Sequence, residues 1–193
     1  FKAALQIAFE HDNTVLIEKF IPGREFRIFI INDEVVGILH RVPANVTGDG
    51  VLNIGQLIDR KNEDPLRGKG YRTPLEKIRK GREEEMFLKQ QGMDFNTVPK
   101  EGEVVYLREN SNISTGGDSI DFTDDIDDSY KAIAVEAAKA LNVKITGLDM
   151  MIQDIHAPAT PDNYAIIEMN FNPAIHIHCY PFKGKNRHLN HKM

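Results

Sequence analysis

Hydrophobic and polar residues alternate in two segments near the C-terminal end of the chain, residues 147–152 and 166–171. An alternation of period two is typical of β-strands, in which successive side chains point to opposite faces. The residues between them, 153–163, contain two prolines and the pair Asp162-Asn163, which favour a loop. We therefore predict an antiparallel hairpin whose three oxygen-bearing side chains share one face: Asp149, Glu168 and Asn170.

A second hairpin is predicted from residues 24–31 and 35–42, which flank the turn-forming pair Asn32-Asp33. In its first strand Arg27 alternates with apolar residues and shares a face with Glu25. Two further strands are predicted over residues 14–18 and 104–107.

Helical periodicity is clearest after residue 123, where an apolar stripe follows an acidic cluster that suits a helix N-terminus: Ile126, Tyr130, Ile133, Ala134, Ala137, Ala138 and Leu141. A helix is also predicted over residues 1–9. Asn53 is expected to cap a short helix that carries Ile54, Leu57 and Ile58. The sequence Thr73-Pro74-Leu75-Glu76 combines a capping box with proline at the first helical position, and we expect it to start a charged surface helix that ends near Gly92.

Turn-forming and polar residues predict three loops, over residues 43–50, 63–72 and 110–118, and the second of these is expected to be mobile. The pattern contains no linker that would divide the chain. The predicted class is α+β, with a mainly antiparallel sheet flanked by helices.

The composition of the chain favours a globular protein and argues against two other classes, nucleic-acid-binding and membrane-spanning proteins. The 193 residues are 41% hydrophobic, which is enough to build a core. A net charge of −5 with scattered basic residues argues against a nucleic-acid-binding protein, and no apolar run approaches the 18 residues of a membrane span. The single cysteine, Cys179, cannot form an internal disulfide, which agrees with a reducing cytoplasm. Because the chain starts at Phe1 inside a predicted helix, we expect it to be part of a longer protein.

The three polar residues of the C-terminal hairpin suit a hard divalent cation. Two carboxylates and an amide oxygen are ligands that magnesium prefers, and magnesium keeps positions open for water and nucleotide phosphates. The alternative is a solvated polar face of an antiparallel sheet, which for any single Asp or Glu is the commoner situation.

Five motifs, of which the C-terminal hairpin is the last, follow one another along the chain. Glu18-Lys19-Phe20-Ile21, with Glu25 after a turn, places backbone groups and a carboxylate where an adenine edge and a ribose could bind. Arg41-Val42-Pro43-Ala44, residues 107–112, the Ser114-Thr115-Gly116-Gly117 segment and the metal-binding hairpin come next. This order resembles the ATP-grasp ligases over nearly the whole chain. Within them it is similar to the glutathione synthetase portion of bifunctional glutamate–cysteine ligase/glutathione synthetases and, through residues 47–50 and 112–117, to cyanophycin synthetase.

The resemblance implies roles for individual residues. Glu18, Lys19 and Ile21 would lie at the adenine, Glu25 at the ribose, and the three hairpin residues would be the magnesium ligands. The loop Asn112, Ser114, Thr115, Gly116 and Gly117 would close over the γ-phosphate. Three arginines would have catalytic roles at the phosphates and the acyl group: Arg27, Arg41 and Arg108.

Residue chemistry agrees with these roles, since guanidinium groups bind carboxylate and phosphoryl oxygens, and glycine amides can approach a phosphate closely. For Arg27 and Arg41 a cross-strand ion pair with Glu25 or Glu34 is an equally good interpretation from the sequence alone.

The activity implied by the resemblance is ATP-dependent formation of glutathione from γ-glutamylcysteine and glycine through an acyl phosphate. It would use two magnesium ions, or manganese, in a cytoplasmic protein whose full-length form is a homodimer. ATP-grasp enzymes carry two lysines and a glycine-rich loop upstream of the adenine strand, and nothing before Thr14 can supply them. We therefore expect this partial ATP-grasp domain, residues 1–193, to fold and not to turn over by itself.

Three alternatives stay open at this point. One is an ATP-grasp ligase for another pair of amino acids, as in cyanophycin synthesis or dipeptide ligation. A second is a noncatalytic nucleotide-binding module. The third is a transition-metal site at His176, His178 and Cys179, although structural zinc usually has four ligands.

Overall fold

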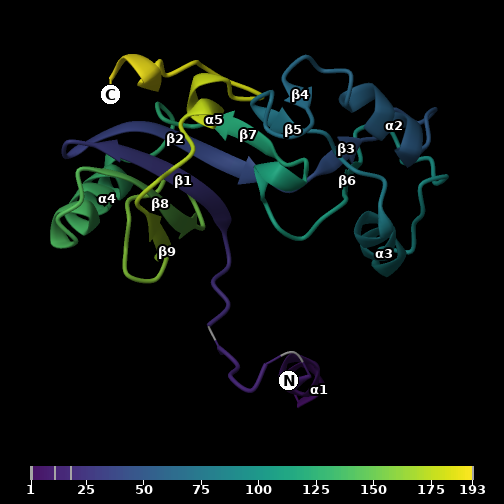
Figure 1. Cartoon of the computed structure of the whole chain (residues 1–193), viewed down its shortest axis with the longest axis horizontal. Helices are drawn as coiled ribbons and strands as arrows, with labels where there is room; N and C mark the ends of the chain where they lie inside the picture. The colour runs from purple at the N-terminus through teal and green to yellow at the C-terminus, as the bar shows by residue number, and fades with distance from the viewer. Residues whose placement is uncertain (1, 11, 18, 193) are drawn as a thin grey trace.

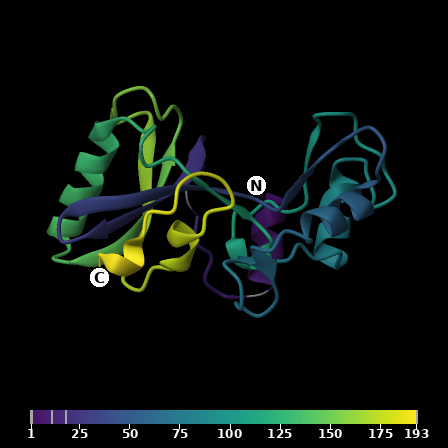
Figure 2. The ribbon, with the colours of Figure 1, turned by 90° about the horizontal axis from the view of Figure 1, so that it is seen from above.

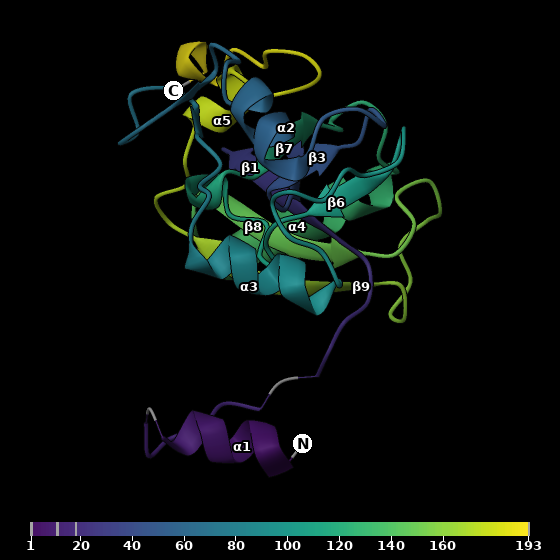
Figure 3. The same cartoon turned by 90° about the vertical axis from the view of Figure 1, so that its right-hand side faces the viewer.

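A computed structural model of the chain describes residues 2–10, 12–17 and 19–192. Its largest part is a five-stranded sheet between two layers of helix, with α4 on one face and the C-terminal segment with α5 on the other (Figure 1). A second, smaller unit built around α2 and α3 lies beside the sheet (Figure 2). Helix α1 (Lys2–Phe9) lies apart from both units, at the end of an extended segment (Figure 3).

The sheet has the strand order β7-β2-β1-β8-β9, and every neighbouring pair is antiparallel. Its strands are β1 (Arg24–Ile31), β2 (Glu34–Val42), β7 (Asp118–Asp121), β8 (Ile145–Ile152) and β9 (Tyr164–Asn170). Asn32 and Asp33 both have positive φ, as the tight turn between β1 and β2 requires. Both predicted hairpins are therefore confirmed.

Helix α4 (Asp128–Ala140) covers one face of the sheet through residues spaced by four. Ile126, Tyr130, Ala134 and Ala138 are buried against apolar side chains of β1 and β8. The Asp127 carboxylate accepts a hydrogen bond from the backbone amide of Ser129, which agrees with the expected capping by this acidic cluster. The predicted helix is confirmed, although it ends one residue before Leu141, whose side chain is exposed.

The opposite face is partly covered by the C-terminal segment, which contains α5 (His176–Cys179) and η2 (Leu189–His191). Cys179 and Leu189 pack on apolar residues of β1 and β2. Arg187 binds the carboxylates of Asp121 and Asp124, which fastens this segment to the edge strand β7.

The second unit has its own apolar core. Its elements are β3 (Asn45–Thr47), α2 (Ile54–Lys61), β4 (Arg67–Gly68), β5 (Leu75–Glu76), α3 (Arg82–Gln90) and β6 (Val104–Tyr106). Asn53 and Gln56 form a reciprocal capping box at α2, so the predicted cap is confirmed. The strand predicted at residue 104 is present as β6, paired with β3.

The helix predicted to start at Thr73 is wrong, because these residues pair with β4 instead. The amides of Leu75 and Lys77 donate to the carbonyls of Leu66 and Gly68. The helix begins at Arg82, where the Glu84 carboxylate accepts a hydrogen bond from the amide of Gly81.

Other boundaries also need correction. No strand forms over residues 14–17, whose extended backbone has no ladder partner among the described residues; residue 18 lies outside them. The predicted loop 43–50 contains β3, and the predicted loop 110–118 contains the short helix η1 (Ile113–Thr115). Over the described ranges, no helix is both long and apolar enough to cross a membrane.

Candidate functional site

Charged side chains form a row across the face of the sheet opposite to α4. Arg27 on β1 lies directly opposite Asp149 on β8, and Asp149 lies opposite Glu168 on β9. Residues paired in this way on antiparallel strands point to the same side of the sheet. The register therefore brings together charges that are far apart in the sequence.

Two guanidinium groups converge on the Asp149 carboxylate, which is 2% exposed. Arg27 binds it with a fork, through Nε to Oδ1 and through Nη2 to Oδ2 at 2.8 Å. Arg41, from β2, donates Nη2 to the same Oδ2 at 2.9 Å. Such charge-assisted and bidentate bonds are the strongest hydrogen bonds that side chains make.

The arginines determine the ionisation of this buried carboxyl. Burial acts to raise the pKa of Asp149, but the hydrogen bond from Arg27 and the charges of Arg41 and Arg27 outweigh it. The pKa of Asp149 therefore lies below its ordinary value, and the group is an anion at neutral pH.

The hairpin brings the three predicted metal ligands together. Asp149 and Glu168 face each other across β8 and β9, and Asn170 lies two residues further along β9. The Nδ2 group of Asn170 donates to Glu168 Oε1 at 3.0 Å, so Oδ1 is the atom of Asn170 that would meet a cation. Two carboxylates and one amide oxygen fit the preference of a hard divalent ion.

Glu25, the predicted ribose ligand, lies at the start of β1 beside the same row. Its carboxylate pairs with Arg41 and accepts a hydrogen bond from the Ser111 hydroxyl. Arg41 thus contacts both Glu25 and Asp149. The ion pair between Arg41 and Glu25 is the cross-strand pair that the sequence offered as an alternative to a ligand role.

The loop that contains Asn112, Ser114, Thr115, Gly116 and Gly117 lies next to these residues. The amides of Gly116 and Gly117 donate to the carbonyls of Ile113 and Asn112, so both are used inside the loop. A Cβ added to Gly116, which has φ of 95°, would lie 2.8 Å from the Cα of Ile78. The two glycines are therefore required by the packing of the loop itself.

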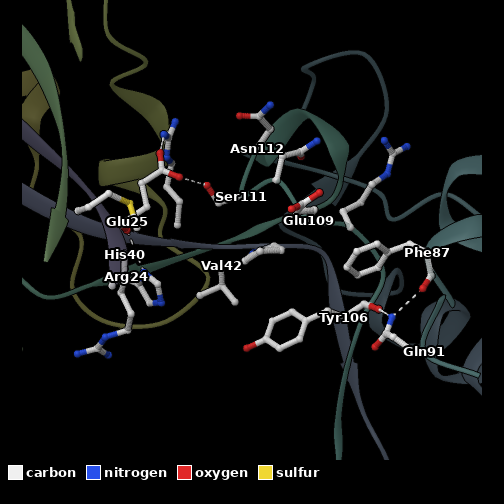
Figure 4. A pocket seen from close by; sticks show the side chains of 16 residues that line it. Arg24, Glu25, His40, Val42, Phe87, Gln91, Tyr106, Glu109, Ser111 and Asn112 are labelled. Atoms are coloured by element: carbon white, nitrogen blue, oxygen red, sulfur yellow. Dashed lines mark hydrogen bonds and ion pairs between the residues drawn. The ribbon is translucent and has the colours of Figure 1, made fainter. Parts of the chain in front are cut away.

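A pocket of about 650 Å³ lies between the sheet and the second unit. Figure 4 shows Glu25 directed toward Ser111 on one side, and the rings of Phe87 and Tyr106 on the other. Among the predicted site residues, Glu25, Arg41, Arg108 and Asn112 line it.

A smaller cavity of about 190 Å³ lies on the charged face. Its walls include four predicted site residues, Arg27, Arg41, Asn112 and Ser114. Since Arg41 and Asn112 line both hollows, they stand between the larger pocket and this cavity.

The other predicted residues are Arg108, at the larger pocket, and the residues before β1. Arg108 binds Glu83 and the buried Glu84, so its contacts hold the start of α3. Lys19 and Ile21 belong to the extended segment before β1, and Glu18 lies outside the described residues.

Sequence reasoning missed two residues of this region. Ser111 belongs to the 107–112 motif, which predicts no separate role for it, yet its hydroxyl donates to the carboxylate of Glu25. His40 lines the larger pocket and donates Nδ1–H to the carbonyl of Glu25 at 3.0 Å. Burial and the charge of Arg24 lower the pKa of His40 to about 4, so it is neutral at pH 7. The alternation in β2 places His40 on the face opposite to Arg41, which gave no reason to select it.

The transition-metal alternative is not supported. Over the described ranges, no group of three or more His, Cys, Asp or Glu side chains is arranged to hold a metal ion. His178 is fully buried with its ring edge-on to Phe29, and Cys179 belongs to the apolar cluster of the C-terminal segment.

Comparison with known proteins gives matches over the whole chain, although no family model matches it. The chain is 64% identical over 193 residues to the glutathione biosynthesis bifunctional protein GshAB of Desulfotalea psychrophila, and 58% identical to that of Clostridium perfringens. It covers 25% of the length of each. The crystal structure of a bifunctional glutathione synthetase from Pasteurella multocida matches 98% of the chain with a TM-score of 0.84 and 46% identity, and the match covers 26% of that protein.

The chain thus spans about a quarter of the length of the curated relatives that it matches. Identity of this level over the whole chain, together with a matching fold, confirms the expected ATP-grasp architecture. The chain resembles the glutathione synthetase portion of the bifunctional glutathione biosynthesis proteins and has the ATP-grasp fold.

Proposed function

We propose that the protein containing this chain is an ATP- and magnesium-dependent ligase that joins γ-glutamylcysteine to glycine. ATP would transfer its γ-phosphoryl group to the glycine-accepting carboxylate of γ-glutamylcysteine, which gives an acyl phosphate and ADP. The amine of glycine would then attack the acyl carbon, phosphate would leave, and a proton would be released as the amide of glutathione forms.

The observation that carries the proposal is the convergence of Arg27 and Arg41 on Asp149 beside the 112–117 loop, in a chain similar along its whole length to relatives named for glutathione biosynthesis. Two cations held on a rigid sheet face suit the charge that develops at phosphoryl and acyl oxygens. Arg41 would steady the oxyanion at the acyl carbon, and Arg27 would hold Asp149 in place.

Asp149, Glu168 and Asn170 would hold magnesium. When bound, the ion would neutralise and orient the phosphates of the nucleotide. Glu25 would bind the ribose once its contacts with Arg41 and Ser111 are exchanged for ribose hydroxyls, and the segment around Glu18, Lys19 and Ile21 would contact the adenine. The loop of Asn112, Ser114, Thr115, Gly116 and Gly117 would close over the γ-phosphate with the side chains of Asn112 and Ser114, which line the smaller cavity. The amides of the last three residues are used inside the loop.

The same proposal covers the metal, the assembly and the location of the protein. The site would hold two metal ions and would accept manganese in place of magnesium, and the full-length protein would be a cytoplasmic homodimer. Arg108, which contacts Glu83 and Glu84, would support the reaction by holding α3 at the edge of the larger pocket.

The test is a phosphate-release assay on the complete gene product with ATP, magnesium, γ-glutamylcysteine and glycine, with glutathione identified by mass spectrometry. Phosphate and glutathione should appear in equal amounts, and neither should appear when either amino-acid substrate is omitted. Release of phosphate with another acceptor but not with glycine would overturn the proposed substrate pair. Nucleotide binding with no release under any combination would indicate a noncatalytic module.

A further inference from the structure

One buried arginine outside the predicted site contacts the loop of residues 112–117. The Arg67 side chain is 0% exposed. Its Nη1 donates to the carbonyl of Gly116 at 3.0 Å and to the carbonyl of Glu76 at 2.9 Å, and its Nη2 pairs with the Asp118 carboxylate. A single guanidinium therefore joins the second unit, the loop and the first residue of β7.

The partner of Arg67 is itself firmly held. Asp118 accepts hydrogen bonds from Lys61 Nζ at 2.6 Å and from Asn45 Nδ2 at 3.0 Å. The ring of Phe182 lies 5.4 Å from the guanidinium carbon, within the range of a cation–π contact. Asp118 is thus held from α2 and β3, and Phe182 lies against the guanidinium, so groups outside residues 112–117 position the Arg67 fork.

Gly116 is also confined from a second side. The backbone of Ile78 lies so close that Gly116 has no room for a Cβ. Ile78 is fixed by Asn62, whose side chain accepts from its amide and donates to its carbonyl, both at 2.8 Å. Gly116 therefore lies between Arg67, which orients its carbonyl, and Ile78, which limits its movement.

We propose that Arg67 is a positioning residue for the ligase reaction, and that it acts by fixing the carbonyl of Gly116 and hence the conformation of the 112–117 loop. Arg67 does not touch the reacting groups. The catalytic part of this inference rests on the proposed function, in which the loop meets the γ-phosphate, whereas the conformational part rests on the contacts of Arg67 alone.

Arg187 offers a matched control. Its side chain is 16% exposed and binds a buried aspartate of β7, Asp121, with two nitrogens. Arg187 belongs to the C-terminal segment, and its partners, Asp121 and Asp124, lie outside the loop. Arg67→Lys keeps the charge and can still pair with Asp118, while the second nitrogen, Nη1, which donates to both carbonyls, is lost. Arg67→Met removes both, and Arg187→Met removes a comparable ion pair elsewhere.

Amide hydrogen exchange of the 193-residue chain is the direct measurement. The amides of Thr115, Gly116 and Gly117 are hydrogen-bonded inside the loop and should be protected in the wild type. In Arg67→Lys their exchange should accelerate about tenfold to a hundredfold, the effect expected for loss of one hydrogen bond to a charged group. Arg187→Met should lower the unfolding midpoint and leave the three amides protected. Unchanged protection in Arg67→Lys and Arg67→Met, or an equal loss in Arg187→Met, would overturn the conformational part.

Steady-state kinetics of the complete gene product test the catalytic part. Arg67→Lys should lower kcat about tenfold or more with little change in the KM for ATP, the pattern of an interaction needed only in the transition state, and Arg187→Met should keep the wild-type kcat. A wild-type kcat in Arg67→Lys, despite accelerated exchange of the loop, would refute the positioning role. If the wild-type protein forms no glutathione, the proposed function fails and the exchange result still decides the conformational part.

Discussion

The two faces of the five-stranded sheet differ in chemistry although the same strands build both. On the α4 face, Phe26, Ile28, Leu148 and Met150 are fully buried among apolar side chains. Arg27 lies between Phe26 and Ile28 in the sequence, and Asp149 lies between Leu148 and Met150. These two side chains point to the opposite face, where they form a buried ion pair. Side chains alternate between the faces with period two, so a one-residue shift in strand pairing would move every side chain to the other face. Burial of the apolar face therefore fixes the register, and the register brings the charged side chains together.

The comparison separates stability from function. Burial of apolar side chains against α4 stabilises the sheet without any requirement for charge. The charged face holds buried groups that need one another, because an unpaired buried charge costs far more free energy than an intact pair contributes. Substitutions on the two faces should therefore have effects of different kinds.

Asp149→Asn should give the largest loss of stability. Removal of one carboxylate leaves the buried guanidinium of Arg27 without its counter-ion, and breaking a buried pair in this way costs about 3 to 5 kcal/mol. Urea unfolding followed by circular dichroism measures it. The control is Asp162→Asn, an exposed loop residue, which should change the free energy of unfolding by less than about 0.5 kcal/mol. Equal, small effects of both substitutions would show that the pair is solvated.

Leu148→Ala changes the neighbouring residue on the other face. Loss of a fully buried leucine side chain should lower the free energy of unfolding by about 2 to 5 kcal/mol. The ion pair of Arg27 and Asp149 should survive, so nucleotide binding by the folded protein should not change. Ile167→Ala is the control, because that side chain on β9 is 55% exposed. A loss no larger than that of Ile167→Ala would contradict the packing of α4 on this face.

Arg41→Lys tests the charged face without removing its positive charge. Arg41 meets Glu25 and Asp149 through Nη2 alone, so its other guanidinium donors are the ones that would reach the reacting oxygens. A lysine keeps the positive charge but has no such fixed set of donors, so the turnover of the complete gene product should fall nearly as far as in Arg41→Ala. The loss of a charge-assisted bond is worth roughly 1.5 to 3 kcal/mol, or about tenfold to a hundredfold in rate. Arg60→Lys, on the exposed surface of α2, should turn over at the wild-type rate. Full activity in Arg41→Lys would mean that Arg41 has only a structural role, through its ion pairs with Glu25 and Asp149.

The pH dependence of stability should show a smaller effect from the buried histidine under the charged face. Burial, with the charge of Arg27, lowers the pKa of His178 to about 3. Below pH 6.5 the unfolded chain takes up a proton that the folded chain does not, so this residue removes about 1.4 kcal/mol of stability per pH unit between pH 6 and 4. His178→Phe should flatten the dependence by that amount in urea unfolding at pH 7, 6, 5 and 4. An unchanged slope would mean that His178 is protonated in the folded protein.

Local patterns were sufficient to predict the two hairpins, helix α4 and the capped helix α2, because each depends on residues close in the sequence. The polar face of the C-terminal hairpin was also predictable, since alternation alone places Asp149 and Glu168 together. The helix expected at Thr73 failed because a hydrogen bond to Leu66 outweighed a good capping sequence.

The contacts that organise the site could not be predicted, because they join distant parts of the chain. Arg27 and Asp149 are separated by 122 positions, and Arg67 and Asp118 by 51. Segment 63–72 was expected to be mobile, yet it supplies the buried Arg67. Only the strand order and the packing of the second unit decide which charges meet.

The most direct test of the charged face as a metal-dependent catalytic site is Glu168→Gln in the complete gene product, with phosphate release and the unfolding midpoint measured on the same samples. The substitution removes a charge and little volume from an exposed side chain of β9, so the midpoint should stay within about a degree or two, as for other surface substitutions. If Glu168 is a magnesium ligand, turnover at saturating magnesium should fall at least about a hundredfold. Loss of a group that only orients a metal ligand already costs up to about a hundredfold, and loss of a ligand itself should cost no less. Wild-type turnover in Glu168→Gln would contradict the account and leave the row of charges as a structural feature of the sheet.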